Sequence, residues 1–253
     1  MARIFAIANQ KGGVGKTTTS VNLAAGLAQS DKRVLLVDLD PQGNATMGSG
    51  VNKSKLERTI YHVLLGLGDA ANIRTRVESG YDLVPANREL AGAEIELVDL
   101  PNREGRLRAA LDRLAGDYDF ILIDCPPSLS LLTVNAFAAA EQVLIPMQCE
   151  YYALEGLSDL VDTIKRVRAH LNPRLEIAGL LRTMFDPRNT LANQVSQQLE
   201  QHFGDKVYRT MVPRNVRLAE APSYGAPAVV WDKTSKGAQA YVALTAEILE
   251  GFA

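Results

Sequence analysis

The chain has 253 residues, of which 47% are hydrophobic and 22% are charged, and its formal net charge is −2. This composition is typical of a globular protein with a substantial core, and its bulk charge gives no support for a nucleic-acid or membrane partner. No apolar run approaches the roughly 20 residues that a membrane-spanning helix needs. We therefore expect one domain over residues 1–253.

The cysteines and the N-terminus predict the compartment. Two cysteines, Cys125 and Cys149, are too few for a disulfide framework, which favours a reducing cytosol. The chain begins with a predicted strand rather than with the charged and then apolar segment of a secretory signal. We expect a cytoplasmic protein without a membrane partner.

A glycine-rich turn between a predicted strand and a predicted helix is the strongest signal in the chain. The apolar run 4–8 precedes the sequence KGGVGKTT at 11–18, and small and apolar residues follow over 19–29. This order predicts a phosphate-binding loop, because glycines let successive N–H groups point at one anion and the helix N-terminus adds further donors. The predicted nucleotide-binding residues are Lys11, Gly12, Gly13, Val14, Gly15, Lys16, Thr17 and Thr18.

The loop also departs from the usual pattern. Position 10 is Gln where that pattern has Gly, and a second lysine, Lys11, follows. We expect Lys16 to reach the outer phosphates of ATP and the Thr17 hydroxyl to contact Mg²⁺. KGGVGKTT resembles the deviant Walker A loop of the ParA, MinD and nitrogenase iron-protein group. That resemblance implies that Lys11 crosses a dimer interface to the partner's nucleotide and takes part in catalysis with Lys16.

Two acidic motifs follow predicted buried strands. The run 33–38 reads as a strand covered on both faces and leads into DLDPQGN at 38–44, where we expect Asp40 to orient the attacking water. An ordinary solvated turn would have a similar composition. The run 118–124 ends in Asp124, which we predict to hold Mg²⁺ through water, because Mg²⁺ gives up its waters reluctantly.

The remaining patterns predict the fold class. Strands are expected over 81–85, 142–147 and 177–184, and helices over 89–103, 107–114, 151–171 and 237–252. Buried strands alternate with helices, which indicates an α/β protein with a doubly wound, mainly parallel sheet flanked by helices. With the loop at 11–18, this is the fold of a P-loop NTPase.

Later segments extend the family resemblance over residues 2 to about 250. The sequences TMFDPR at 183–188 and VPRNVRLAEAP at 212–222 resemble those of ParA (Soj) type chromosome and plasmid partition ATPases. The resemblance implies that Pro213 and Asn215 line the adenine site, with Met184 near it. It further implies an ATPase of the slow switch type that needs ATP and Mg²⁺, dimerises with ATP, and associates with the nucleoid.

DNA binding receives little support from charge alone. Residues 151–253 hold 12 Lys and Arg against 11 Asp and Glu, so scattered, solvated cations would be the simpler interpretation. The family resemblance favours nonspecific binding of double-stranded DNA by the ATP dimer, with hydrolysis stimulated by a ParB-type partner. Phosphate contacts of this kind are independent of sequence and sensitive to salt. The candidate DNA-binding residues are Arg188, Arg214, Arg217, Lys233 and Lys236.

Three other functions share these motifs. A MinD-like positioning ATPase would need a basic amphipathic tail, whereas this chain ends in the acidic sequence 247–253. An iron–sulfur reductase would use Cys125 and Cys149, which lack the glycine-rich context of that family. A nucleotide-gated scaffold without turnover would differ from an ATPase only in whether ATP is consumed.

Overall fold

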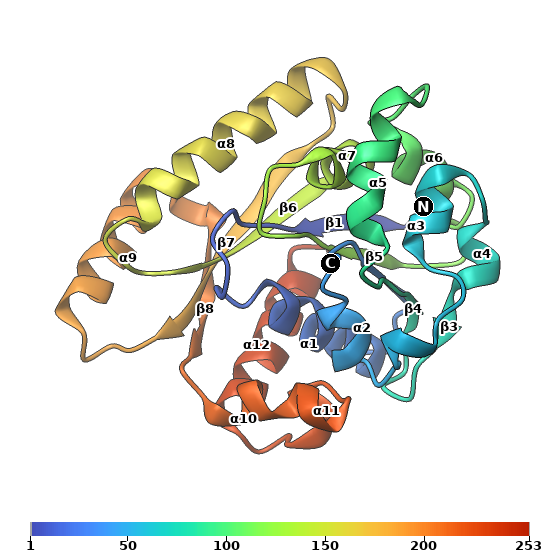
Figure 1. Ribbon diagram of the computed structural model, residues 1–253. Coiled ribbons are helices and arrows are strands. Elements are labelled where there is room, and N and C mark those ends of the chain that lie inside the picture. Colours follow the sequence, from blue (N-terminus) through green and yellow to red (C-terminus); the bar gives the residue numbers. More distant parts are fainter. Residues whose placement is uncertain (1, 253) are drawn as a thin grey trace.

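An eight-stranded sheet forms the centre of the computed structural model, which describes residues 2–252 (Figure 1). The strand order is β3-β4-β2-β5-β1-β6-β7-β8, and every neighbouring pair is parallel except β3 with β4. The strands are β1 (Arg3–Ile7), β2 (Val34–Asp38), β3 (Thr75–Arg76), β4 (Asp82–Val84), β5 (Phe120–Asp124), β6 (Gln142–Gln148), β7 (Glu176–Phe185) and β8 (Val207–Pro213).

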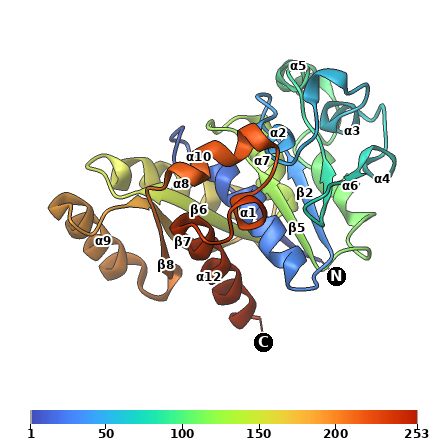
Figure 2. The same ribbon diagram turned by 90° about the horizontal axis from the view of Figure 1, so that it is seen from below.

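Helices cover both faces of this sheet (Figures 1 and 2). The helices are α1 (Lys16–Gln29), α2 (Asn44–Gly48), α3 (Ile60–Leu65), α4 (Ala70–Ile73), α5 (Leu90–Glu96), α6 (Arg106–Asp112), α7 (Leu131–Ala139), α8 (Ala153–His170), α9 (Thr190–Phe203), α10 (Val216–Glu220), α11 (Ala228–Trp231) and α12 (Lys236–Glu250). One apolar core joins the sheet to α3 and α5–α9, and the other joins it to α1, α11 and α12. The predicted doubly wound, mainly parallel fold is confirmed.

The central strands form because their side chains are apolar on both faces. All five residues of β2 and of β5 are buried, as helices above and below the sheet require. The described helices include none that is long and apolar enough to cross a membrane. The predicted strands and helices agree with the observed ones to within a few residues, apart from the segment 89–103. There, α5 ends at Glu96 and a 3₁₀ turn (Leu97–Asp99) precedes Pro101.

Nine elements have no counterpart in the sequence prediction: β3, β8, α2, α3, α4, α7, α9, α10 and α11. Helix α7 is apolar around almost its whole circumference, so it lacks the 3.6-residue periodicity by which helices are recognised. Strand β8 lies at the edge of the sheet and only two of its residues, Val207 and Val212, are buried, so it lacks the continuous apolar run of the central strands.

The strand register brings the loop and the acidic motifs together. Ile7, at the end of β1, pairs with Asp124 at the end of β5. Asp38, at the end of β2, pairs with Asp124 from the other side. The carboxyl ends of three neighbouring parallel strands therefore meet at one edge, where α/β proteins of this kind bind ligands.

Candidate nucleotide site

The loop between β1 and α1 has the backbone conformation of an anion cradle. Gly13 and Gly15 have φ angles of 73° and 88°, in the left-handed region that residues with a Cβ atom rarely adopt. Helix α1 begins at Lys16, and within residues 2–252 its start has neither a side-chain cap nor an acidic residue in its first turn. The first N–H groups of the helix are thus available to bind an anion.

Lys16 is held inside this cradle. Its side chain is buried, with 7% of the residue exposed, and its Nζ donates to the carbonyl oxygen of Lys11 at 3.1 Å. Burial lowers the pKa of Lys16, while the nearby carboxylates of Asp124 and Asp40 oppose that change. A buried ammonium at the start of a helix can bind phosphate oxygens strongly, because little water screens it.

Asp124 is completely buried beneath the start of α1. Its Oδ2 accepts a hydrogen bond from Thr17 Oγ1 at 2.8 Å, and its Oδ1 accepts one from Ser20 Oγ at 2.8 Å. Burial raises the pKa of Asp124, and the adjacent Asp38 raises it further, whereas the bonds from Ser20 and Thr17 lower it. Two neighbouring buried carboxylates next to hydroxyl oxygens are a donor set that fits Mg²⁺, a cation that prefers oxygen ligands.

The two carboxylates of the DLD sequence have different surroundings. Asp38 Oδ2 accepts bonds from the backbone N and the Oγ1 of Thr46, at 2.8 and 2.7 Å, and Oδ1 accepts one from the backbone N of Asp40. Asp40 Oδ1 accepts from the backbone N of Gln42 at 2.9 Å, and its Oδ2 has no hydrogen bond within the described residues. Both oxygens of Asp38 therefore accept hydrogen bonds from neighbouring residues, while one oxygen of Asp40 is available to another partner.

A cavity of about 370 Å³ opens beside the loop. Met184, Pro213 and Asn215, which the family resemblance implies at the adenine site, line it together with Gly15 and Thr18. The end of β7 is fastened to the loop, since Thr183 Oγ1 donates to the carbonyl oxygen of Val14 at 2.8 Å. The volume falls in the range of sites for small ligands.

The side chain of Lys11, the first residue of the predicted loop, is paired outside the loop. Its ammonium forms an ion pair with Glu150, the residue that follows β6 and Cys149, and about half of each side chain is exposed. The crossing role of Lys11 stays a prediction, because it requires a second chain.

The two candidate DNA-binding arginines that match the family best are paired with carboxylates. Arg188 binds both oxygens of Asp186, at 2.9 and 2.8 Å. Arg217 contacts Glu220 at 2.9 Å and Asp232 at 3.4 Å. These pairs reduce the net positive charge that the arginines present.

The other candidate cations have no ion pair within residues 2–252, and they come from different places in the fold. Arg214 lines the 370 Å³ cavity, whereas Lys233 and Lys236 lie near the start of α12. Arg214 is thus placed to contact a ligand of the cavity as well as DNA. The assignment of all five cations to DNA stays a prediction.

Sequence reasoning missed three residues of this site. Ser20 lies one helical turn after Lys16 and Thr17, so helical spacing could have placed it beside Asp124. Thr183 and Glu150 reach the loop only through the order of the strands, and no local pattern indicated their contacts.

This chain is similar to known proteins over most of its length. A family model described as an AAA domain matches residues 2–177. Sporulation initiation inhibitor protein Soj of Bacillus subtilis is 55% identical over 250 residues, which cover 98% of each chain. Chromosome partitioning protein ParA of Caulobacter vibrioides is 51% identical over 250 residues, which cover 98% of this chain and 94% of that protein.

A solved structure resembles the whole fold. The crystal structure of cobyrinic acid a,c-diamide synthase from Mycobacterium smegmatis with bound ADP and magnesium superposes with a TM-score of 0.88 and 39% identity. The match covers 100% of this chain and 96% of that one. A second crystal structure of that protein holds an ATP analogue and magnesium.

Proposed function

This chain belongs to the Soj and ParA family of chromosome-partitioning ATPases, and on that premise we propose that it is a slow, switch-type ATPase that moves DNA. ATP with Mg²⁺ binds in the crevice at the carboxyl ends of β1, β2 and β5. The observation that carries this proposal is the linked group of Lys16, Thr17 and Asp124 beneath the uncapped start of α1.

Each residue of the site has a proposed task. The N–H groups of residues 12–18 and the Lys16 ammonium bind the phosphates, and the adenine occupies the cavity beside Pro213 and Asn215. Thr17 and, through water, Asp124 would hold Mg²⁺, which when bound neutralises charge on the phosphates. The free oxygen of Asp40 orients the water that attacks the γ-phosphate.

Dimerisation converts nucleotide binding into a switch. Two chains close on two nucleotides, and Lys11 of each chain leaves Glu150 to bind the phosphates held by the other. Charge on the transferred phosphoryl group is then stabilised by Lys16 and Lys11. The dimer binds DNA without sequence preference, and hydrolysis, accelerated by a ParB-type partner, separates the chains and releases the DNA.

The proposal is tested by measuring the oligomeric state and DNA binding with ATP, with ADP and without nucleotide. We expect a dimer that binds DNA only with ATP, and a monomer with weak DNA binding in the other two conditions. A chain that remains monomeric with a nonhydrolysable ATP analogue, or that binds DNA equally in all three conditions, would contradict the switch.

A further inference from the structure

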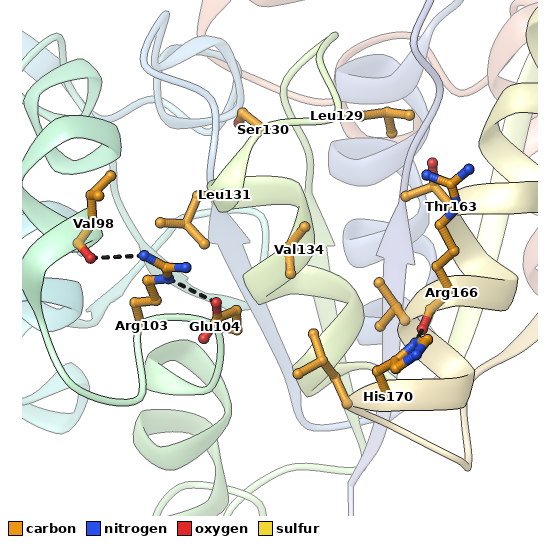
Figure 3. Close-up of a pocket in the computed structure, with 12 residues that line it drawn as sticks. Val98, Arg103, Glu104, Leu129, Ser130, Leu131, Val134, Thr163, Arg166 and His170 are labelled. Atoms are coloured by element: carbon orange, nitrogen blue, oxygen red, sulfur yellow. Dashed lines mark hydrogen bonds and ion pairs between the residues drawn. The ribbon is translucent and has the colours of Figure 1, made fainter.

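A second large cavity lies away from the nucleotide site. It is a groove of about 760 Å³ between α7, the C-terminal half of α8 and the segment that joins α5 to α6. Figure 3 shows Val98 and Arg103 on one side of the groove, and Arg166 and His170 on the other. It shares no lining residue with the cavity beside Gly15, so the proposed nucleotide chemistry does not explain it.

Large apolar side chains gather in this groove and face solvent. Val98 is 50% exposed, Leu171 is 38% exposed and Leu129 is 36% exposed. Single exposed apolar residues are common on protein surfaces, but several that converge on one groove with a polar rim mark a site of interaction. Burying them against a partner would be favourable by the hydrophobic effect.

The polar groups of the groove are incompletely satisfied. Ser130 Oγ is buried and has no hydrogen-bond partner within residues 2–252. Arg103 is paired with Glu104 at 2.8 Å and also donates to the carbonyl oxygen of Val98. Arg166 has no ion pair within the described residues. The lining therefore carries one unbalanced positive charge and one unused hydroxyl.

We propose that this groove is a docking site for a partner protein, which inserts a short apolar segment flanked by an Asp or Glu residue. The apolar side chains of the segment cover Val98, Leu129 and Leu171, and its carboxylate pairs with Arg166. The charge of the rim selects the acidic segment over a basic one.

The shape of the groove favours a protein segment over a small molecule. The groove is wide open to solvent, whereas small-molecule sites enclose most of the surface of their ligand. An extended or helical segment seated in such a groove is a recurrent mode of peptide recognition. The proposal does not depend on the proposed function, because its test measures binding without nucleotide.

The test uses a library of random 16-residue peptides displayed on phage and selected on the full chain. Enriched peptides are synthesised, and their affinities are measured by fluorescence anisotropy for the wild type, Val98→Glu, Arg166→Glu and the control Val242→Glu. Val242 is 45% exposed on α12, away from the groove, so the control places the same charge on a different apolar site. Unchanged basal ATPase activity verifies the folding of each variant.

We expect enriched peptides to combine apolar residues with Asp or Glu. Val98→Glu should weaken their binding at least ~10-fold, because it places a charge among the apolar side chains of the contact. Arg166→Glu should weaken it by about 10-fold through charge repulsion, and Val242→Glu should leave it unchanged. Enrichment of peptides that bind all variants equally, selection of basic peptides, or failure to enrich any peptide that depends on Val98 would overturn the proposal.

Discussion

At the scale of single residues, the two oxygens of Asp40 define the predicted chemistry. One accepts from the backbone of Gln42, and the other has no partner within residues 2–252. We expect Asp40→Ala to lower ATP turnover at least ~100-fold, the loss that follows removal of a group that positions and activates a water. Phosphate release measures this turnover. The ATP-dependent dimer, measured by light scattering, should persist, and so should the nucleotide binding on which it depends.

The matched control for Asp40→Ala is Asp112→Ala, which removes an exposed carboxylate at the end of α6. Turnover of the control should equal that of the wild type. Normal phosphate release by the Asp40 variant would remove this residue from the chemical step and direct attention to Asp38.

The ion pair between Lys11 and Glu150 leads to a second prediction. Lys11 is paired with Glu150 in the single chain, so under the proposed crossing role it must leave Glu150 to reach the partner's phosphates. An exposed ion pair contributes roughly 0.2–1 kcal/mol and two such pairs break per dimer, so Glu150→Gln should tighten the dimer formed with a nonhydrolysable ATP analogue by about 2- to 30-fold. Sedimentation equilibrium measures this change.

Glu155→Gln is the control for that variant. Glu155 lies in the first turn of α8, is exposed, and has no ion pair within the described residues. A weaker dimer in Glu150→Gln, with the control unchanged, would show that Glu150 contacts the partner chain instead of restraining Lys11.

At the scale of elements, helices α1 and α12 approach each other closely at Gly26. A Cβ atom at this position would lie 2.3 Å from Thr245 Oγ1, and that hydroxyl also donates to the carbonyl oxygen of Tyr241. Gly26→Ala gains about 1 kcal/mol of helix propensity, yet the overlap should cost more. We expect a net loss of roughly 1–2 kcal/mol in the free energy of unfolding, measured by urea denaturation.

Gly156 in α8 provides the opposite case. No atom lies within 4 Å of a Cβ atom built there, and the residue has ordinary helical geometry. Gly156→Ala should therefore increase the free energy of unfolding by up to about 1 kcal/mol. Equal effects of the two substitutions on the free energy of unfolding would show that contact with α12 does not make Gly26→Ala destabilising.

The elements that the sequence predicted well share one property, which is a periodic or continuous apolar pattern. Strands β2 and β5 are such runs, and their closing carboxylates could be placed at one edge because parallel strands end together. Helix α7 could not be predicted because burial nearly all around removes its polar face. The contact from Thr183 to Val14 spans 169 residues and depends on strand order, which no local pattern encodes.

At the scale of the whole molecule, the distribution of charge predicts that one chain would bind DNA weakly. The net charge is −2, and Arg188 and Arg217 are each paired with carboxylates of the same chain. Under the proposed function, useful affinity would require two chains, because a dimer presents every cation twice. In this way the sheet edge that binds nucleotide would control DNA binding on surfaces that do not touch the phosphates.

This arrangement predicts the salt dependence of DNA binding. Each phosphate contact contributes a slope of about −0.9 to the dependence of log affinity on log salt concentration. Arg217→Glu removes one contact per chain, so the ATP dimer should bind DNA more weakly, with a slope smaller in magnitude by about 2. Basal ATPase activity should not change, because Arg217 pairs with Glu220 and Asp232 and does not line the nucleotide cavity.

Arg113→Glu is the control for that experiment. Arg113 is exposed at the end of α6 and is likewise paired with a carboxylate, that of Asp69. The control equalises the change in total charge, so any difference in slope reports the position of the arginine rather than its charge. If both variants reduced the slope equally, DNA affinity would depend on the overall charge of the dimer, and the assigned cations would not form a defined DNA-binding surface.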